Sequence, residues 1–314
     1  MIKHLISISD LSKSEVVDII SQAEKLKEVN ERDIKKVPTL RGKTIINLFL
    51  EPSTRTRLSF EIGGKRLSAD TINLSSSGSS ALKGESFADT LLNIQALNPD
   101  IIVLRDKNSG SPFLAKKYLS KTAVINAGDG MREHPTQALL DLMTIKQVKK
   151  KIDNLKICII GDIRHSRVAK SNIYLHMLLG NEINLVGPET LVPLEFQNKN
   201  LFGNKIKIFD NIQKGIENAD VIICLRMQFE RMQDSYITTI QDYIDKFALS
   251  EKLYNKYSKD AMILHPGPVN RGVELDSKLI EQSSSYLQDQ VNNGLALRMA
   301  LLIKYSYALK EENA

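Results

Sequence analysis

The residues best suited to chemistry lie at 53–57, which reads Ser-Thr-Arg-Thr-Arg and follows an apolar run at 43–50 that predicts a strand. Apolar residues at helical spacing come next. They predict a helix opened by Pro52 and the two hydroxyl residues, because Ser and Thr cap the first amides of helices. A helix start carries unpaired N–H groups and about half a positive charge. With two fork-shaped guanidinium groups added, the stretch predicts a phosphate clamp.

The bland alternative for this stretch is a capped helix with a solvated basic face. A glycine-rich P-loop is excluded, because the sequence contains no G-x-x-x-x-G-K-[ST] pattern.

Further polar clusters follow other predicted strands. They are Arg105 after 101–104, His134–Gln137 after 124–130, Asp162–Arg167 after 156–160, Arg226 and Gln228 after 221–225, and His265–Pro268 after 262–264. In open parallel sheets, ligands bind at the carboxyl ends of the strands. We therefore expect one cleft that is rich in arginine and poor in paired carboxylates.

The elements that must position these clusters alternate along the chain. Strands are expected at 43–50, 70–74, 101–104, 122–126, 156–160, 183–186, 205–209, 221–225 and 262–264, and helices at 12–28, 86–97, 112–119 and 135–148. This order predicts an α/β fold of two doubly wound domains with mostly parallel sheets and an active site in the cleft between them.

A polar break at 149–154 marks the expected domain boundary. It gives a first domain at 1–150 and a second at 151–289. A last helix at about 290–310 has a broad apolar face, so we expect it to pack back on the N-terminal domain.

Composition narrows the class of protein. The chain has 314 residues, of which 42% are hydrophobic and 25% charged, and a net charge of +6. The basic residues are spread out and Trp is absent, which argues against nucleic-acid binding, while small anionic substrates explain the excess equally well. The polar N-terminus and the lack of an apolar run of ~18 residues predict no signal peptide, no membrane helix and a cytoplasmic location.

The two cysteines, Cys158 and Cys224, lie inside apolar runs and are expected to be buried, inert thiols. Without clustered Cys or His residues we expect no metal site. Neither G-x-S-x-G nor G-x-G-x-x-G is present, which argues against a serine hydrolase and a dinucleotide site. The residue set favours group transfer between anionic substrates by positioning and charge stabilisation.

His134 has two interpretations. It is either a structural histidine at a helix start or a site residue, and the Pro-Thr-Gln that follows favours the site. A neutral imidazole in that position can donate a hydrogen bond to a carbonyl oxygen.

Four segments together resemble the aspartate carbamoyltransferase catalytic chain. They are Glu51–Arg57, Leu82–Glu85, His134–Asp141 and His265–Pro268, which occur in this order over nearly the whole sequence. The resemblance implies that the chain joins carbamoyl phosphate to L-aspartate, giving N-carbamoyl-L-aspartate and phosphate in pyrimidine synthesis. It also implies that no metal or cofactor is needed.

Residue by residue, the resemblance implies three groups in the carbamoyl phosphate site. The phosphate is held by Ser53, Thr54, Arg55, Thr56 and Arg105. The carbonyl oxygen is faced by Thr56, Arg105 and His134, and the carbamoyl amide is bound by Gln137 and the Gly267–Pro268 backbone. The implied catalytic residues are Arg55, Thr56, Arg105 and His134. Arg57 is assigned a structural role in the helix. A preplaced donor to the developing oxyanion is typically worth about 2.7–4 kcal/mol.

The aspartate site implied by the resemblance contains Lys83, Arg167, Arg226 and Gln228. In the family the lysine loop comes from the neighbouring subunit of a trimer, so Ser79 or Ser80 and Lys83 would act in trans in a homotrimer. Glu51, Arg167 and Arg231 resemble an interdomain latch that holds the closed state. Ordinary surface ion pairs are the alternative for these three.

Other functions remain open at this point. An ornithine carbamoyltransferase shares the phosphate residues, but two arginines would repel a cationic side chain, and that family has His-Cys-Leu-Pro where this chain has His265–Pro268. A carbamoyltransferase for another amine and an inactive pathway scaffold are further alternatives. The sequence leaves open whether regulatory chains or a dihydroorotase bind, although 269–274 resembles the unregulated branch.

Overall fold

The computed structural model describes residues 4–75, 85–228 and 239–307, without the side chains of Ser284 and Ser285. The chain forms two compact units, one of Met1–Leu140 with Val291–Ala314 and one of Asp141–Gln290. The boundary between them falls inside a continuous helix, whereas the division expected at residue 150 lies after that helix. A polar stretch in the sequence indicates a loop, whereas the boundary between the compact units lies inside a helix.

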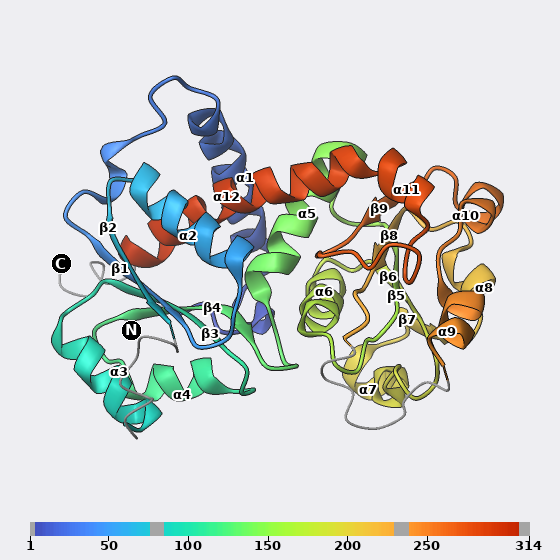
Figure 1. Ribbon diagram of the computed structural model, residues 1–314, viewed down its shortest axis with the longest axis horizontal. Helices are drawn as coiled ribbons and strands as arrows, with labels where there is room; N and C mark the ends of the chain where they lie inside the picture. Colours follow the sequence, from blue (N-terminus) through green and yellow to red (C-terminus); the bar gives the residue numbers. More distant parts are fainter. Residues whose placement is uncertain (1–3, 76–84, 229–238, 308–314) are drawn as a thin grey trace. The chain divides into compact units, whose positions relative to one another are not determined.

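Unit 1 is built on a parallel sheet with the strand order β2-β1-β3-β4 (Figure 1). Its strands are β1 (Thr44–Phe49), β2 (Asp70–Ser75), β3 (Ile101–Asp106) and β4 (Ala123–Asp129). Its helices are α1 (Lys13–Lys27), α2 (Thr54–Arg66), α3 (Phe87–Ala96) and α4 (Ser111–Tyr118). The chain passes between the units through α5 (Pro135–Lys149) and α12 (Ser284–Tyr307).

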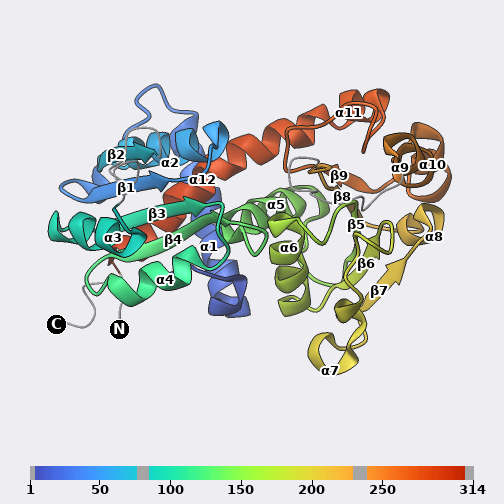
Figure 2. The same ribbon diagram turned by 60° about the horizontal axis from the view of Figure 1, so that its bottom comes forward.

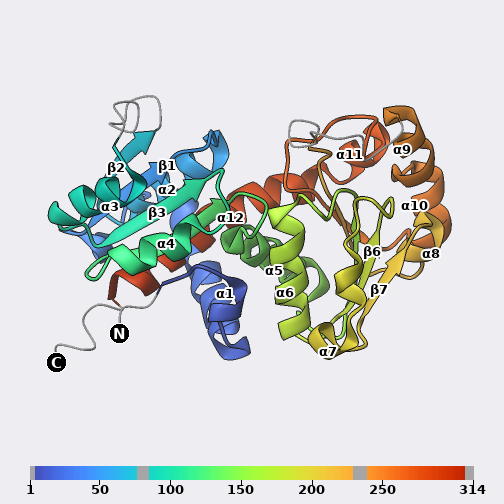
Figure 3. The ribbon, with the colours of Figure 1, turned by 90° about the horizontal axis from the view of Figure 1, so that it is seen from below.

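Helices cover both faces of the unit 1 sheet because its central strands are apolar on both sides. Ile46, Ile102 and Val124 pack with residues of α3 and α4 in one core cluster, and Figure 3 shows these helices along that face. On the other face lie α2 and α12. A Cβ on Gly63 of α2 would lie 3.3 Å from Met299 of α12, so the C-terminal helix packs on the N-terminal unit, as predicted.

Unit 2 carries a second parallel sheet in the order β7-β6-β5-β8-β9 (Figure 2). The strands are β5 (Lys156–Ile160), β6 (Glu182–Val186), β7 (Ile206–Phe209), β8 (Val221–Cys224) and β9 (Met262–Leu264). The helices are α6 (Arg167–Leu178), α7 (Lys199–Phe202), α8 (Ile212–Ile216), α9 (Ile240–Phe247), α10 (Glu251–Tyr257) and α11 (Ser277–Gln282).

Alternate residues of these strands enter two separate cores. Ile157 and Ile159 face one core, and Cys158 and Ile160 face the other, as the period of a strand covered on both faces requires. Cys158 and Cys224 are fully buried, and burial raises the pKa of both thiols. The prediction that both thiols are buried is confirmed.

The predicted α/β class with parallel sheets is confirmed, and most element bounds agree within two residues. The exceptions have local causes. α12 begins at Ser284 rather than near 290, because its first turn is polar and lacks apolar periodicity. β4 runs on past the expected end at residue 126 to Asp129, through residues that are also buried. In the described part of the chain, no helix is long and apolar enough to cross a bilayer.

Candidate functional site

The turn between β1 and α2 has an unusual helix start. Ser53 occupies the N-cap position with extended backbone angles, yet its side chain makes no hydrogen bond to the helix amides. At the starts of α1, α3 and α6, by contrast, Ser12, Ser86 and Ser166 each accept a bond from a backbone N–H. The expectation that the Ser53 hydroxyl caps α2 was wrong. The amides of this first turn therefore remain available to an external acceptor.

The side chains of this turn differ in exposure. Thr54 and Arg55 are exposed, whereas Thr56 is buried in the first turn of α2. Partial desolvation lowers the pKa of Arg55, but a guanidinium remains protonated at neutral pH. The first turn of α2 thus carries both an exposed cation and uncapped amides.

Arg105 joins this turn through strand pairing. Phe49 pairs with Arg105 across β1 and β3, and the Leu50 amide donates to the Arg105 carbonyl at 2.8 Å. The guanidinium Nη1 donates to the Ala127 carbonyl at 3.3 Å, and Nε lies 3.5 Å from Glu51 Oε2. Glu51 therefore helps to hold Arg105 beside the turn. The expected latch from Glu51 to Arg167 and Arg231 stays a prediction, and Arg231 lies outside the described residues.

His134 ends a loop that buried polar contacts brace. Glu133, next to it, accepts hydrogen bonds from Ser7 Oγ at 2.5 Å and from the Ile8 amide at 3.0 Å. Asp129 accepts from the Glu133 amide at 3.1 Å, and burial raises the pKa of this carboxyl. The sequence analysis missed these residues. The polar residues inside the buried run Asn-Ala-Gly-Asp-Gly were the available signal.

His134 and Gln137 themselves are buried at the start of α5. The His134 ring Nδ1 lies 3.4 Å from Thr136 Oγ1, and the Gln137 amide donates to the His134 carbonyl at 2.9 Å. Since β1, β3 and β4 are neighbours, their carboxyl ends bring seven of the predicted residues to one sheet edge. This unit 1 cluster consists of Ser53, Thr54, Arg55, Thr56, Arg105, His134 and Gln137.

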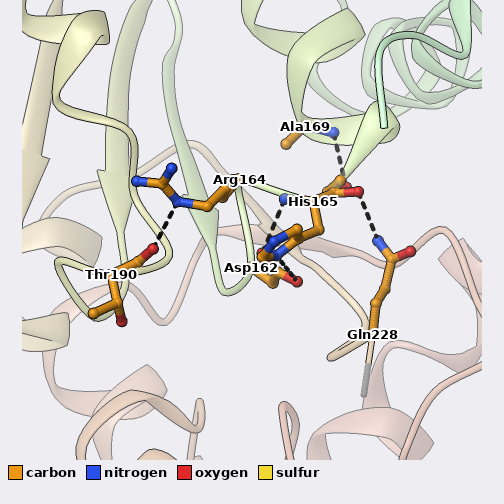
Figure 4. A network of polar contacts seen from close by, with 7 residues as sticks. Asp162, Arg164, His165, Ala169, Thr190 and Gln228 are labelled. Carbon is orange, nitrogen blue, oxygen red and sulfur yellow. Dashed lines mark hydrogen bonds and ion pairs between the residues drawn. The ribbon is translucent and has the colours of Figure 1, made fainter. Parts of the chain in front are cut away.

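In unit 2, the loop between β5 and α6 is held by a buried carboxylate. His165 Nδ1 lies 2.9 and 3.1 Å from the two carboxylate oxygens of Asp162, and its backbone amide donates to Oδ1 at 3.0 Å (Figure 4). Ser166 caps α6 through a bond from the Ala169 amide at 3.1 Å. Arg167, the first residue of α6, is thereby fixed and is 6% exposed.

The segment after β8 is tied to the same loop. Gln228 Nε2 donates to the His165 carbonyl at 3.4 Å (Figure 4), and Arg226 is half-buried. Since β5 and β8 are neighbours, Arg167, Arg226 and Gln228 share one edge of the sheet. Asp162 and His165 were named only as part of a strand-end cluster, and their Asp-x-x-His spacing was the missed signal.

The third polar segment of unit 2 follows β9. His265 Nδ1 accepts a hydrogen bond from the Gly267 amide at 2.8 Å, and its Nε2 lies 3.4 Å from Glu274 Oε1. The His265 amide donates to Gln290 Oε1 at 3.3 Å, and Gln290 in turn donates to Asp141 at 2.7 Å. These contacts set the backbone at Gly267 and Pro268. The unit 2 cluster is Arg167, Arg226, Gln228, Gly267 and Pro268.

Some predicted residues cannot be placed. Lys83, Ser79 and Ser80 lie outside the described residues. Within the described ranges, no group of three or more His, Cys, Asp or Glu side chains is arranged to hold a metal ion.

Comparison with known protein families covers almost the whole chain. Residues 3–147 match the model described as "Aspartate/ornithine carbamoyltransferase, carbamoyl-P binding domain", and residues 153–305 match "Aspartate/ornithine carbamoyltransferase, Asp/Orn binding domain". The chain belongs to the aspartate/ornithine carbamoyltransferase family. The resemblance read from the four sequence segments is confirmed.

Two curated relatives within this carbamoyltransferase family carry the name "Aspartate carbamoyltransferase catalytic subunit". The protein of Trichlorobacter lovleyi is 50% identical over 96% of this chain and 95% of its own length. The protein of Carboxydothermus hydrogenoformans is 49% identical over 96% of this chain and 95% of its own length.

Solved structures of the family share the fold. The catalytic subunit of M. jannaschii aspartate transcarbamoylase has a TM-score of 0.84 at 34% identity and covers 99% of both chains. Aspartate transcarbamoylase from Trypanosoma cruzi, in complex with carbamoyl phosphate and aspartate, has a TM-score of 0.86 at 25% identity and covers 96% of both chains.

Proposed function

We propose that this chain transfers the carbamoyl group of carbamoyl phosphate to the amine of L-aspartate, giving N-carbamoyl-L-aspartate and phosphate for pyrimidine biosynthesis. The full-length relatives at 50% and 49% identity support aspartate over ornithine. The observation that carries the substrate class is the pair of arginines in the unit 2 cluster, Arg167 and Arg226. Two guanidinium groups suit a dicarboxylate and repel the cationic side chain of ornithine.

In this proposal the unit 1 cluster binds carbamoyl phosphate. The uncapped amides at the start of α2, the hydroxyls of Ser53 and Thr54, and the guanidinium of Arg55 surround the phosphate. Arg105, held by Glu51 and the Ala127 carbonyl, reaches from the phosphate to the carbonyl oxygen. Gln137 and the backbone at Gly267–Pro268 take the carbamoyl amide.

The reaction needs charge stabilisation more than covalent catalysis. As the aspartate amine attacks the carbonyl carbon, a C–N bond forms and negative charge develops on the carbonyl oxygen. Thr56, Arg105 and His134 donate to that oxygen, and their fixed positions avoid reorganisation during the step. The C–O bond to phosphate then breaks, and the departing phosphate takes the amine proton.

His134 acts as a neutral donor in this scheme. It is buried at the amino end of α5, where the positive end of the helix dipole disfavours an imidazolium. A neutral ring still donates one N–H bond. His134 directly follows the loop that Glu133 and Asp129 brace.

The amino-acid half of the site consists of Arg167, Arg226 and Gln228, with Lys83 from a neighbouring subunit. In a homotrimer, Ser79 or Ser80 and Lys83 would complete each site, and Glu51, Arg167 and Arg231 would latch the closed state. We place this catalytic chain in the cytoplasm, with regulatory chains or a dihydroorotase as candidate partners. Mixing Lys83→Ala and Arg55→Ala subunits tests sharing, because some mixed sites carry neither change and should restore activity.

The deciding experiment offers carbamoyl phosphate with L-aspartate and, separately, with L-ornithine. We expect N-carbamoyl-L-aspartate from the first and no citrulline from the second. Turnover of ornithine would move the chain to the other branch of the family, and no turnover of either amine would favour the inactive scaffold.

A further inference from the structure

A buried arginine of the last helix contacts α2, the helix whose start we assign to the phosphate. Arg298 of α12 is 5% exposed, and its Nη1 donates to Ser59 Oγ at 2.7 Å. Its guanidinium carbon lies 5.3 Å from the centroid of the Phe60 ring, within the range of a cation–π contact. The proposed site residues of unit 1 do not include Arg298, although it touches α2, the helix that carries three of them.

Hydrogen bonds continue from Arg298 to the start of α2. Ser59 Oγ donates to the Thr56 carbonyl at 2.9 Å. The same peptide group carries the Arg57 amide, which donates to the Ser53 carbonyl at 3.3 Å. A continuous series of donors and acceptors, which we call the Arg298 relay, thus joins Arg298, Ser59, Thr56 and Ser53. Bonds in such a series polarise and strengthen one another.

Two glycines create the space for this arrangement. A Cβ on Gly294, one turn before Arg298, would lie 2.9 Å from Arg298 Nη1 and 3.1 Å from Leu140. A Cβ on Gly63 would press on Met299. The close packing of α2 against α12 therefore depends on small residues, and it places the guanidinium next to Ser59 rather than in solvent.

A buried cation in this position also has an electrostatic effect. In a medium of low dielectric constant, the charge of Arg298 acts over a longer distance than it would in water. It adds to the partial charge of the helix amides and to Arg55 and Arg105. Burying an arginine is costly unless it is hydrogen-bonded, and an apolar side chain would fill the space as well if packing were its only role.

We propose that Arg298 is a positioning residue for carbamoyl phosphate, which acts through Ser59 on Thr56 and Ser53. This inference rests on the proposed function, since it assumes that the start of α2 binds phosphate. Arg298 does not touch the substrate. It holds the first turn of α2 in the geometry that binds the anion and adds a buried cation beside the same helix.

The test compares three single variants and the double variant Arg298→Met/Ser59→Ala. Arg298→Met removes the charge and the donor at similar volume, and Ser59→Ala interrupts the relay without removing the charge. Lys304→Met is the matched control, because Lys304 is also on α12 and its Nζ lies 3.7 Å from Glu15 Oε1, away from Ser59. The measurements are calorimetric binding of inorganic phosphate, kcat, the KM for L-aspartate at saturating carbamoyl phosphate, and the melting temperature.

We expect Arg298→Met to weaken phosphate binding about ten- to a hundredfold and Ser59→Ala about fivefold, as the usual values of charged and neutral hydrogen bonds imply. The KM for L-aspartate should change less than twofold. Lys304→Met should match the wild type in phosphate binding. In the double variant, the Ser59→Ala effect should be smaller than it is alone, because both changes break one relay.

Three results would overturn the inference. They are wild-type phosphate binding in a folded Ser59→Ala variant, additive effects in the double variant, and an equal loss in Lys304→Met. Ser59→Ala decides the matter if Arg298→Met does not fold. A wild-type protein that makes no N-carbamoyl-L-aspartate would instead count against the proposed function, so the two failures are distinguishable.

Discussion

Helices α2 and α6 begin alike: each follows a strand of a parallel sheet, and each has a serine at the N-cap. Ser166 accepts a hydrogen bond from the Ala169 amide at 3.1 Å, whereas the Ser53 side chain caps nothing. α6 therefore satisfies one of its free amides internally and presents a side chain, Arg167. α2 keeps its amides for a ligand.

The difference suits the two substrates that we propose. A phosphate has several oxygens that many N–H groups can surround, so an uncapped helix start is an efficient site. Two carboxylates of an amino acid are planar and separated, and forked guanidinium groups match them better. A helix start without a side-chain cap is therefore as informative about function as a charged side chain.

Removing the cation from the uncapped helix should have the largest effect. Arg55→Ala should lower kcat about a hundred- to a thousandfold, because it removes a donor that stabilises the transferring group. Steady-state assays at saturating substrates measure this. Arg57→Ala, two residues further on, is the control and should stay within about twofold, and similar losses for both would contradict a specific clamp.

Removing a cation from the unit 2 cluster, which lies by the capped helix α6, should instead affect the binding of L-aspartate. Arg226→Met should raise the KM for L-aspartate roughly ten- to a hundredfold, as loss of a charged hydrogen bond implies, and leave the affinity for phosphate unchanged. Arg164→Ala is the control, since Arg164 is exposed and its Nε donates to the Thr190 carbonyl. Weaker phosphate binding in Arg226→Met would show that the unit 1 and unit 2 clusters do not bind the two substrates separately.

Acid should destabilise unit 2 through a histidine far from its site. His176 is fully buried, and burial lowers its pKa to about 3 from 6.5. Between these values the unfolded chain binds one more proton, so stability falls as pH drops below about 6.5. The loss by pH 5 is at most about 2 kcal/mol. His176→Gln keeps an acceptor for Asn181, and its melting temperature should fall less between pH 7 and pH 5.

The capping serines should give the smallest and most discriminating effects. Ser166→Ala should lower the free energy of unfolding by about 1 kcal/mol. Ser53→Ala should change it by less than half as much, since no cap is lost, and weaken phosphate binding about fivefold. Denaturation with and without phosphate separates the two effects. An equal loss of stability without ligand would mean that Ser53 caps α2 in solution.

The sequence predicted these sheets and the strand-end clusters because both follow from short-range patterns. Apolar runs such as 156–160 mark buried parallel strands directly, and the carboxyl-end rule collects the polar residues that follow them. The residues that support the clusters were missed, because their partners are distant in sequence. Glu133 is bound by Ser7, and Ser59 is bound by Arg298.

Capping was misjudged for a related reason. The sequence around Ser53 contains every feature of a capped helix, and only the rotamer of one side chain decides whether the cap forms. The compact units divide within α5, whereas the two family models meet between residues 147 and 153, close to the break expected from the sequence. Local composition determines neither the rotamer of a side chain nor the point within a long helix at which one compact unit ends.

The order of synthesis has consequences for the discontinuous unit 1. Residues 141–290 are made before α12 is complete. The α2 surface at Ser59 and Gly63 can pack only once α12 has been made, because Arg298, which binds Ser59, lies 239 residues later in the chain. At translation rates of about 5–20 residues per second, the delay is roughly 10–50 s. During that interval the apolar side of α2 is open to chaperones or to wrong partners. The start of α2 can therefore reach its final packing only after α12 has been made.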